Sequence, residues 1–239
     1  MTASKNNDPR RTSTVSRATS GFGSRAGEII STNKVLKNTY MLLSLTILFS
    51  AVTAVVAMHT ATAPMNPILL LVGYFALLFG VNACRNNGFG VVLTFALTGL
   101  LGYSIGPLLN FYVKTFSNGS ELIFMALGST GLIFLLLSAL SLNPEKDFSS
   151  MGKTLFVGML VVFIMSLLNV FIFKLPILQL ALSLIFAGIS GGIIMWQTNM
   201  IVRGGERNYI TATVTLYVSL FNIFLTLLQL LGMFAGNRD

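Results

Sequence analysis

The sequence predicts an all-α integral membrane protein, a seven-transmembrane-helix bundle with a cytoplasmic N-terminus and a C-terminus outside. Hydrophobic residues make up 54% of the 239 positions and charged residues only 9%, whereas a soluble domain carries about 25% charged residues. The apolar runs are long and continuous, without the alternation of a membrane β-barrel. This composition excludes a soluble enzyme, a nucleic-acid-binding domain and a disordered protein.

Seven uncharged runs approach the length of about 20 residues that a helix needs to cross the hydrocarbon core. They cover approximately residues 39–57, 68–84, 89–113, 122–142, 154–173, 175–202 and 209–235. The connections between them are too short to hold a soluble domain. We therefore expect a membrane domain over residues 38–235 and a short outer tail over residues 236–239.

The basic residues predict the orientation of these spans. Twelve of the fifteen Lys and Arg residues lie in the N-terminal segment or in every second connection. The other three, Lys114, Lys174 and Arg238, lie on the opposite side. Because short cytoplasmic loops are enriched in Lys and Arg, the N-terminus is expected inside the cell. The net charge of +8 is thus a topology signal and does not indicate nucleic-acid binding.

Residues 1–37 are rich in Ser, Thr, Asn and Arg, and they carry a net charge of +5. Their composition favours a disordered basic cytoplasmic tail that contacts anionic lipid. A second interpretation is a handle grasped by a protease that pulls on unstructured ends. A third is an organellar transit peptide, although the segment lacks an amphipathic apolar face.

The residues that metal or proton chemistry requires are nearly absent from the predicted spans. The chain has one cysteine, Cys84, and one histidine, His59, so we expect no disulfide, no metal site and no cofactor. No buried carboxylate pair is available to hold Ca²⁺. A rhomboid-like Gly-x-Ser-Gly motif surrounds Ser190, but no histidine base follows it in the chain. The sequence therefore predicts a protein without enzymatic activity.

The last predicted span carries a polar stripe that cannot face lipid. Its members fall within roughly 80° of one helix face: Thr211, Thr215, Ser219, Asn222, Thr226 and Gln229. Plausible partners are polar residues of the two preceding spans: Ser166, Asn169, Gln197, Thr198 and Asn199. The stripe is either a neutral hydrogen-bond network between helices or the wall of a narrow polar path or water-filled cavity.

Small residues predict where helices approach one another closely. Gly188 and Gly192 are four residues apart in the sixth span. In the third span, Gly102 and Gly106 continue a ridge that begins at Thr94 and Thr98. Small residues at this spacing allow close helix packing in lipid, and Pro107 is expected to kink or end its helix.

Several segments of the chain match one known family. They are residues 31–40 (STNKVLKNTY), residues 43–46 (LSLT), residues 98–103 (TGLLGY), Gly106-Pro107, Gly204-Gly205-Glu206 and residues 216–224 (LYVSLFNIF). On these motifs the sequence resembles the Bax inhibitor-1 superfamily, also called the transmembrane Bax inhibitor motif family, and within it the bacterial YccA-type branch. The resemblance covers about residues 29–235.

The resemblance implies a seven-helix bundle in which one central helix is surrounded by the others. It also implies a non-enzymatic inner-membrane protein that modulates the ATP-dependent membrane protease FtsH in membrane-protein quality control and stress response. In the calcium-leak branch, two aspartates of the sixth and seventh helices form a pH-sensitive pair. Gln197 and Ser219 match those positions here, and neither can ionise. A Ca²⁺ leak channel is therefore the alternative function, without the proton-gated latch.

Overall fold

The computed structural model describes residues 33–60, 63–143 and 145–236, and within these ranges all regular secondary structure is helical. The helices are α2 (Lys34–His59), α3 (Pro67–Ala83), α4 (Gly88–Thr115), α5 (Gly119–Ser141), α6 (Met151–Leu168), the π-helical turn η1 (Asn169–Phe173), α7 (Pro176–Val202) and α8 (Tyr209–Gly236). Each predicted apolar run coincides with a helix to within a few residues, so the all-α fold class is confirmed.

Six of the described helices are long and apolar enough to cross a membrane, and α3 is shorter. Its 17 residues span about 25 Å at 1.5 Å per residue, whereas the hydrocarbon core is about 30 Å thick. The chain is therefore a multi-pass membrane protein, while a seventh complete crossing stays a prediction.

The first helix starts earlier than its apolar run. Asn33 Oδ1 accepts a hydrogen bond from the Leu36 N–H at 3.1 Å, which satisfies one of the donors left unpaired at a helix start. The helix therefore includes Lys34 and Lys37, which the sequence analysis grouped with the tail. Residues 1–32, the rest of the expected tail, lie outside the described residues.

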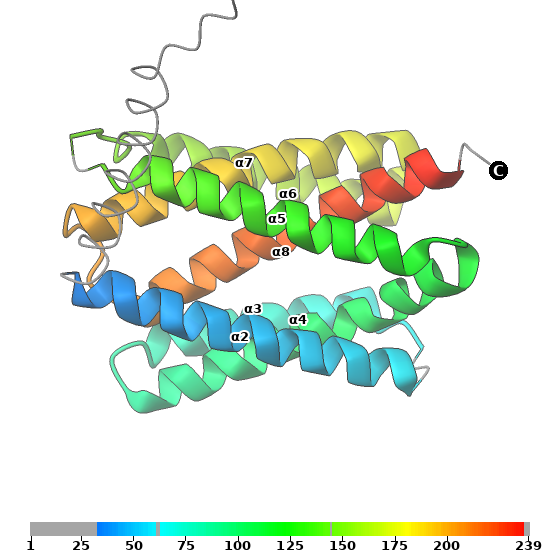
Figure 1. Cartoon of the computed structure of the whole chain (residues 1–239), viewed down its shortest axis with the longest axis horizontal. Coiled ribbons are helices and arrows are strands. Elements are labelled where there is room, and N and C mark those ends of the chain that lie inside the picture. Colours follow the sequence, from blue (N-terminus) through cyan, green and yellow to red (C-terminus); the bar gives the residue numbers. More distant parts are fainter. Residues whose placement is uncertain (1–32, 61–62, 144, 237–239) are drawn as a thin grey trace, which may run out of the picture.

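Helix α8 lies at the centre of the bundle (Figure 1) and packs against α2, α4, α5 and α7. Successive helices run in opposite directions, so the connections alternate between the two ends of the bundle (Figure 1). Arg85, Lys146 and Arg203 lie in connections at one end, together with the start of α2. Lys114 and Lys174 lie at the other end, which is the separation that the sequence predicts.

Helices α2 and α4, which share the most extensive contact among the described helices, meet at glycines. A Cβ atom on Gly102 would collide with the Ser50 carbonyl oxygen and lie 2.6 Å from Ser50 Oγ. One turn further along α4, a Cβ atom on Gly106 would lie 2.9 Å from the Ala54 carbonyl oxygen. The two backbones can approach this closely only because α4 has no side chain at these positions.

Pro107 follows Gly106 inside α4, and the helix continues eight residues beyond it to Thr115. Of the two outcomes expected for Pro107, a kink or an end of the helix, the helix end does not occur. Proline removes one backbone donor, but α4 packs against α2, α3, α5 and α8.

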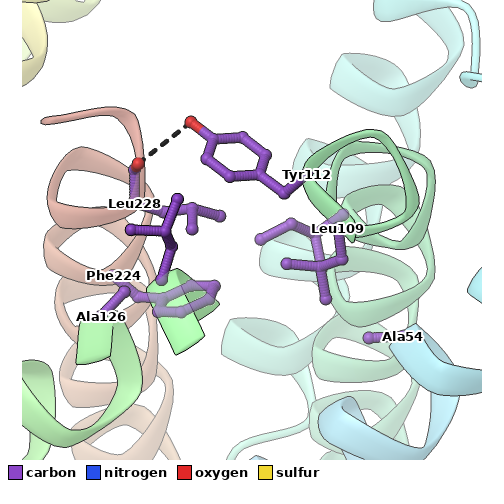
Figure 2. Packing of buried hydrophobic residues seen from close by; sticks show 8 residues of the cluster. Ala54, Leu109, Tyr112, Ala126, Phe224 and Leu228 are labelled. Atoms are coloured by element: carbon purple, nitrogen blue, oxygen red, sulfur yellow. Dashed lines mark hydrogen bonds between the residues drawn. The ribbon is translucent and has the colours of Figure 1, made fainter. Parts of the chain in front are cut away.

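A tyrosine joins α4 to the central helix near the end of the bundle that carries Lys114 and Lys174. Figure 2 shows Tyr112 reaching across from α4, and its hydroxyl donates a hydrogen bond to the Leu228 carbonyl oxygen of α8 at 3.0 Å. The ring packs in a buried cluster with Leu109, Phe224 and Leu228. This cluster fixes one half of α8, and the other half carries part of the polar stripe.

Candidate functional site

The polar stripe of α8 faces its neighbour α7. Asn222 Nδ2 donates a hydrogen bond to Ser190 Oγ at 3.3 Å, and Thr226 Oγ1 donates one to the Ser183 carbonyl oxygen at 2.9 Å. Both partners belong to α7, so these two bonds fix the antiparallel register of the two helices. Because this register continues along the pair, Gln197 of α7 comes level with α8 near Thr215, about one turn from Ser219.

The rest of the stripe differs from the expected network. The hydroxyls of Thr215 and Ser219 donate to carbonyl oxygens four residues back in α8 itself, at 3.0 and 2.9 Å. Short hydroxyl side chains commonly form such bonds within a helix. Interhelical bonding by the stripe is therefore carried by Asn222 and Thr226, which bond to serines that the sequence analysis did not pair with them.

A cavity of about 190 Å³ lies between α6, α7 and α8. Six of its ten lining residues are polar, and all six are uncharged. The polar lining residues are Ser166, Gln179, Ser183, Asn222, Thr226 and Gln229, and the apolar ones are Phe163, Leu182, Phe186 and Leu225. Three of the six predicted stripe positions thus line one cavity.

The turn between α6 and α7 holds one wall of this cavity. Asn169 is 3% exposed, and its Nδ2 donates to Gln179 Oε1 at 3.1 Å and to the Leu175 carbonyl oxygen at 3.2 Å. Its Oδ1 accepts from the Leu175 N–H at 3.1 Å. Lys174 turns the chain with a positive φ of 53°, which is rare for a residue with a side chain. Asn169 therefore holds the Gln179 side chain in position. The expected contact between Asn169 and the stripe is absent from the described hydrogen bonds.

Gln197 lies beyond the cavity, deeper in the bundle. Its side chain is 2% exposed, and Nε2 has no hydrogen-bond partner among the described residues. The hydroxyl groups of Tyr40 and Ser138 are hydrogen-bonded to one another, and fully buried Thr198 contributes a further hydroxyl near Tyr40. Neutral polar groups therefore also gather in the half of the bundle that holds the basic connections.

Asn199, an expected member of the polar interior, has a different position. Its Nδ2 donates to the carbonyl oxygens of Lys146 at 2.9 Å and Ser141 at 3.4 Å, and its Oδ1 accepts from the Phe148 N–H at 3.2 Å. All three partners belong to the end of α5 or the connection that follows it. Asn199 therefore fastens that connection to α7 and does not face the stripe.

The expected packing glycines of α7 differ from one another. A Cβ atom on Gly192 would lie 2.7 Å from Leu155 Cδ2 of α6, whereas one on Gly188 would meet no atom within 4 Å. Gly188 is exposed, so the expectation that it packs against a helix is wrong within the described residues. The four-residue spacing placed both glycines on one side of α7, but α6 packs against that side only near Gly192.

Tyr217 links three helices and was missed by the sequence analysis. Its hydroxyl lies 2.5 Å from Ser50 Oγ of α2 and donates to the Thr98 carbonyl oxygen of α4 at 3.3 Å. Gln179 was missed as well, because one glutamine near a helix start gives no periodic signal. Tyr217 lies within the motif of residues 216–224, which was its only signal in the sequence.

An ion pair lies at the end of the bundle that holds the basic connections, away from the cavity. Arg203 and Asp147 form an ion pair at 3.1 Å. Hydrogen bonds from the Ser149 hydroxyl and N–H lower the pKa of Asp147 below its usual 3.8, with a smaller contribution from Arg203. Among the described residues, no three His, Cys, Asp or Glu side chains are grouped to hold a metal ion.

Comparisons with known proteins agree with the motifs. Residues 32–236 match the family model described as inhibitor of apoptosis-promoting Bax1. The Escherichia coli K12 protein named modulator of FtsH protease YccA is 47% identical over 88% of this chain and 94% of its own length. An uncharacterized membrane protein of Vibrio cholerae is 41% identical over 87% of this chain and 93% of its own. A Helicobacter pylori protein is 30% identical over 90% of this chain and 91% of its own.

Proposed function

Because the chain belongs to the Bax inhibitor-1 family, we propose that it is a non-enzymatic inner-membrane protein that modulates an FtsH-type ATP-dependent protease. The proposed setting is membrane-protein quality control and the stress response. The observation that carries the proposal is the 47% identity, over 88% of the chain, to a protein named as a modulator of that protease. A second Escherichia coli relative with the same identity is named an inner membrane protein.

The proposed topology has seven crossings, with the N-terminus in the cytoplasm and the C-terminus outside. It is supported by the basic connections at one end of the bundle, because cytoplasmic loops carry the excess of Lys and Arg. In this arrangement α3 crosses as a short helix, by local thinning of the bilayer. The proposed domains are a basic cytoplasmic tail up to Asn33 and a membrane domain from Lys34 to Gly236.

Two features support a protein that engages a protease and resists destruction by it. Residues 1–32 are polar and basic, a composition that suits an end which an ATP-driven protease can grasp. The membrane domain is held by the close contact of Gly102 with Ser50 and by the link from Tyr217 to α2 and α4. Extracting one helix must break these contacts together, so the protease is expected to process the chain slowly.

Co-purification tests the partner directly. The full-length chain and a variant lacking residues 1–28 are each expressed with the tagged protease, solubilised in mild detergent and captured. We expect the full-length chain to be retained. Loss of binding in the truncated variant assigns the contact to the tail, and equal binding assigns it to the membrane domain. Capture of neither form would contradict the proposal.

A cation leak is the second candidate, and the polar cavity beside α8 is the observation that favours it. Gln197 and Ser219 supply no charge where the calcium-leak relatives are expected to carry aspartates, and Ca²⁺ sites require several oxygen ligands including charged ones. Flux into liposomes holding the wild type, Ser219→Leu or Asn222→Leu distinguishes the two candidates. We expect wild-type flux equal to that of empty liposomes. Wild-type flux that both leucine variants abolish would establish the leak.

A further inference from the structure

The cavity between α6, α7 and α8 contains hydrogen-bonding groups that no described residue satisfies. The Ser166 hydroxyl and the Gln229 amide line it, and neither has a hydrogen-bond partner among the described residues. Gln179 uses Oε1 to accept from Asn169, which leaves its Nε2 donor for the cavity. Polar groups without partners are costly in hydrocarbon, so the lining requires a polar occupant.

The size and chemistry of the cavity identify that occupant as water. A volume of about 190 Å³ has room for about six water molecules at ~30 Å³ each. The lining offers hydroxyls and amides, which both donate and accept hydrogen bonds, and it offers no ionised group. An anion or a divalent cation would find no opposite charge there, whereas water can bond to every member.

The cavity has a closed inner end. The Asn222–Ser190 hydrogen bond lies at this end, and Ser190 is fully buried. Beyond it, Ile194 and Leu216 are both 0% exposed and pack in one apolar cluster with Ile223. Ser219 is 1% exposed and does not line the cavity.

We propose that this cavity is a blind, water-filled vestibule, which opens at the end of the bundle that carries the α6–α7 turn and stops at the Asn222–Ser190 contact. In the proposed topology that end is the outer one. Water reaches Ser166 and Ser183 but not Ser219. The inference is independent of the protease, because it rests on the geometry of α6, α7 and α8 alone.

The serines of the chain provide a matched series of probes. Cys84 is the single cysteine, so Cys84→Ser gives a thiol-free background. Ser166→Cys and Ser183→Cys place a thiol of nearly the same shape in the cavity, and Ser219→Cys places one beyond its inner end. The matched control is Ser129→Cys, because Ser129 is exposed on α5 within a span and faces hydrocarbon.

The measurement is the rate of modification by a membrane-impermeant maleimide, with right-side-out and inverted membrane vesicles. The thiolate is the reactive form, and it forms only where water is present. We expect Ser166→Cys and Ser183→Cys to react from the outer side at least about tenfold faster than Ser129→Cys. Ser219→Cys is expected to react as slowly as Ser129→Cys from both sides.

Three results would overturn the inference. Equal rates for the cavity cysteines and Ser129→Cys would show that the cavity is dry. A fast reaction of Ser219→Cys would show that the water continues past Asn222. Reaction of Ser166→Cys from the inner side alone would reverse the assigned end. The Ser166 hydroxyl has no described partner to lose, so its variant remains informative if Ser183→Cys fails to accumulate.

Discussion

Replacing Gly102 by alanine is expected to destabilise the bundle, whereas the same change at Gly188 is not. In a helix interior, Gly→Ala alone contributes about 0.5–1 kcal/mol of stability. At Gly102 the added Cβ meets the Ser50 carbonyl oxygen, a backbone atom that can move only if α2 moves. Overpacking of this kind costs about 1–3 kcal/mol. This cost is larger than the gain in helix propensity, except where the smallest cost meets the largest gain. At Gly188 the added Cβ meets no atom within 4 Å, so the gain remains.

Thermal unfolding in detergent measures this difference, with emission from Trp196, the sole tryptophan, as the signal. One kcal/mol corresponds to about 2–4 °C in Tm for a chain of this size. Gly102→Ala is therefore expected to melt several degrees below Gly188→Ala, and Gly188→Ala at or slightly above the wild type. If Gly102→Ala melts at the temperature of Gly188→Ala or higher, that result would contradict the close approach of α2 and α4 at Gly102.

Three further predictions concern single contacts. Asn199→Ala removes the hydrogen bonds to the Ser141 and Lys146 carbonyl oxygens and from the Phe148 N–H, so we expect a loss of about 1–3 kcal/mol and faster proteolysis between residues 142 and 150. The control is Asn118→Ala, at a helix start without a side-chain cap. Tyr112→Phe removes the bond to the Leu228 carbonyl oxygen and should cost about 0.6–1.5 kcal/mol in thermal unfolding, with no such loss for Tyr103→Phe. Folding lowers the pKa of Asp147. The contribution of Asp147 to stability is therefore present above about pH 4 and is lost as the pH falls through the lowered pKa. Hydrogen exchange of the α5–α6 connection should show this loss in the wild type and not in Asp147→Asn.

Continuous apolar runs and connections with basic residues were sufficient to predict the helices of this chain. A membrane-spanning helix is identified by the length and apolar composition of its segment, and both are visible in the sequence. The start of α2 was misplaced because Asn33, and not the first apolar residue, determines where that helix begins. The sequence also left open whether Pro107 kinks or ends its helix, because packing against neighbouring helices, which allows α4 to continue past it, is not visible in a local motif.

The candidate site was predicted less completely. The spacing of polar residues correctly indicated that one face of α8 turns inward, and it correctly placed Asn222 and Thr226 in contacts with another helix. It did not identify their partners, because Ser183 and Ser190 become neighbours of α8 only through the register of two antiparallel helices. It grouped Asn199 with the stripe, whereas the side chain of Asn199 bonds to the α5–α6 connection.

The most direct test of the account is the rate at which the reconstituted protease degrades a membrane-protein client when this chain is present in the same liposomes. The account predicts that the wild-type chain slows client turnover in proportion to its amount, while the chain itself is degraded more slowly than the client. A variant lacking residues 1–28 shows whether the tail is needed for the effect. Client turnover that does not change at any ratio of this chain to protease would contradict the proposed function.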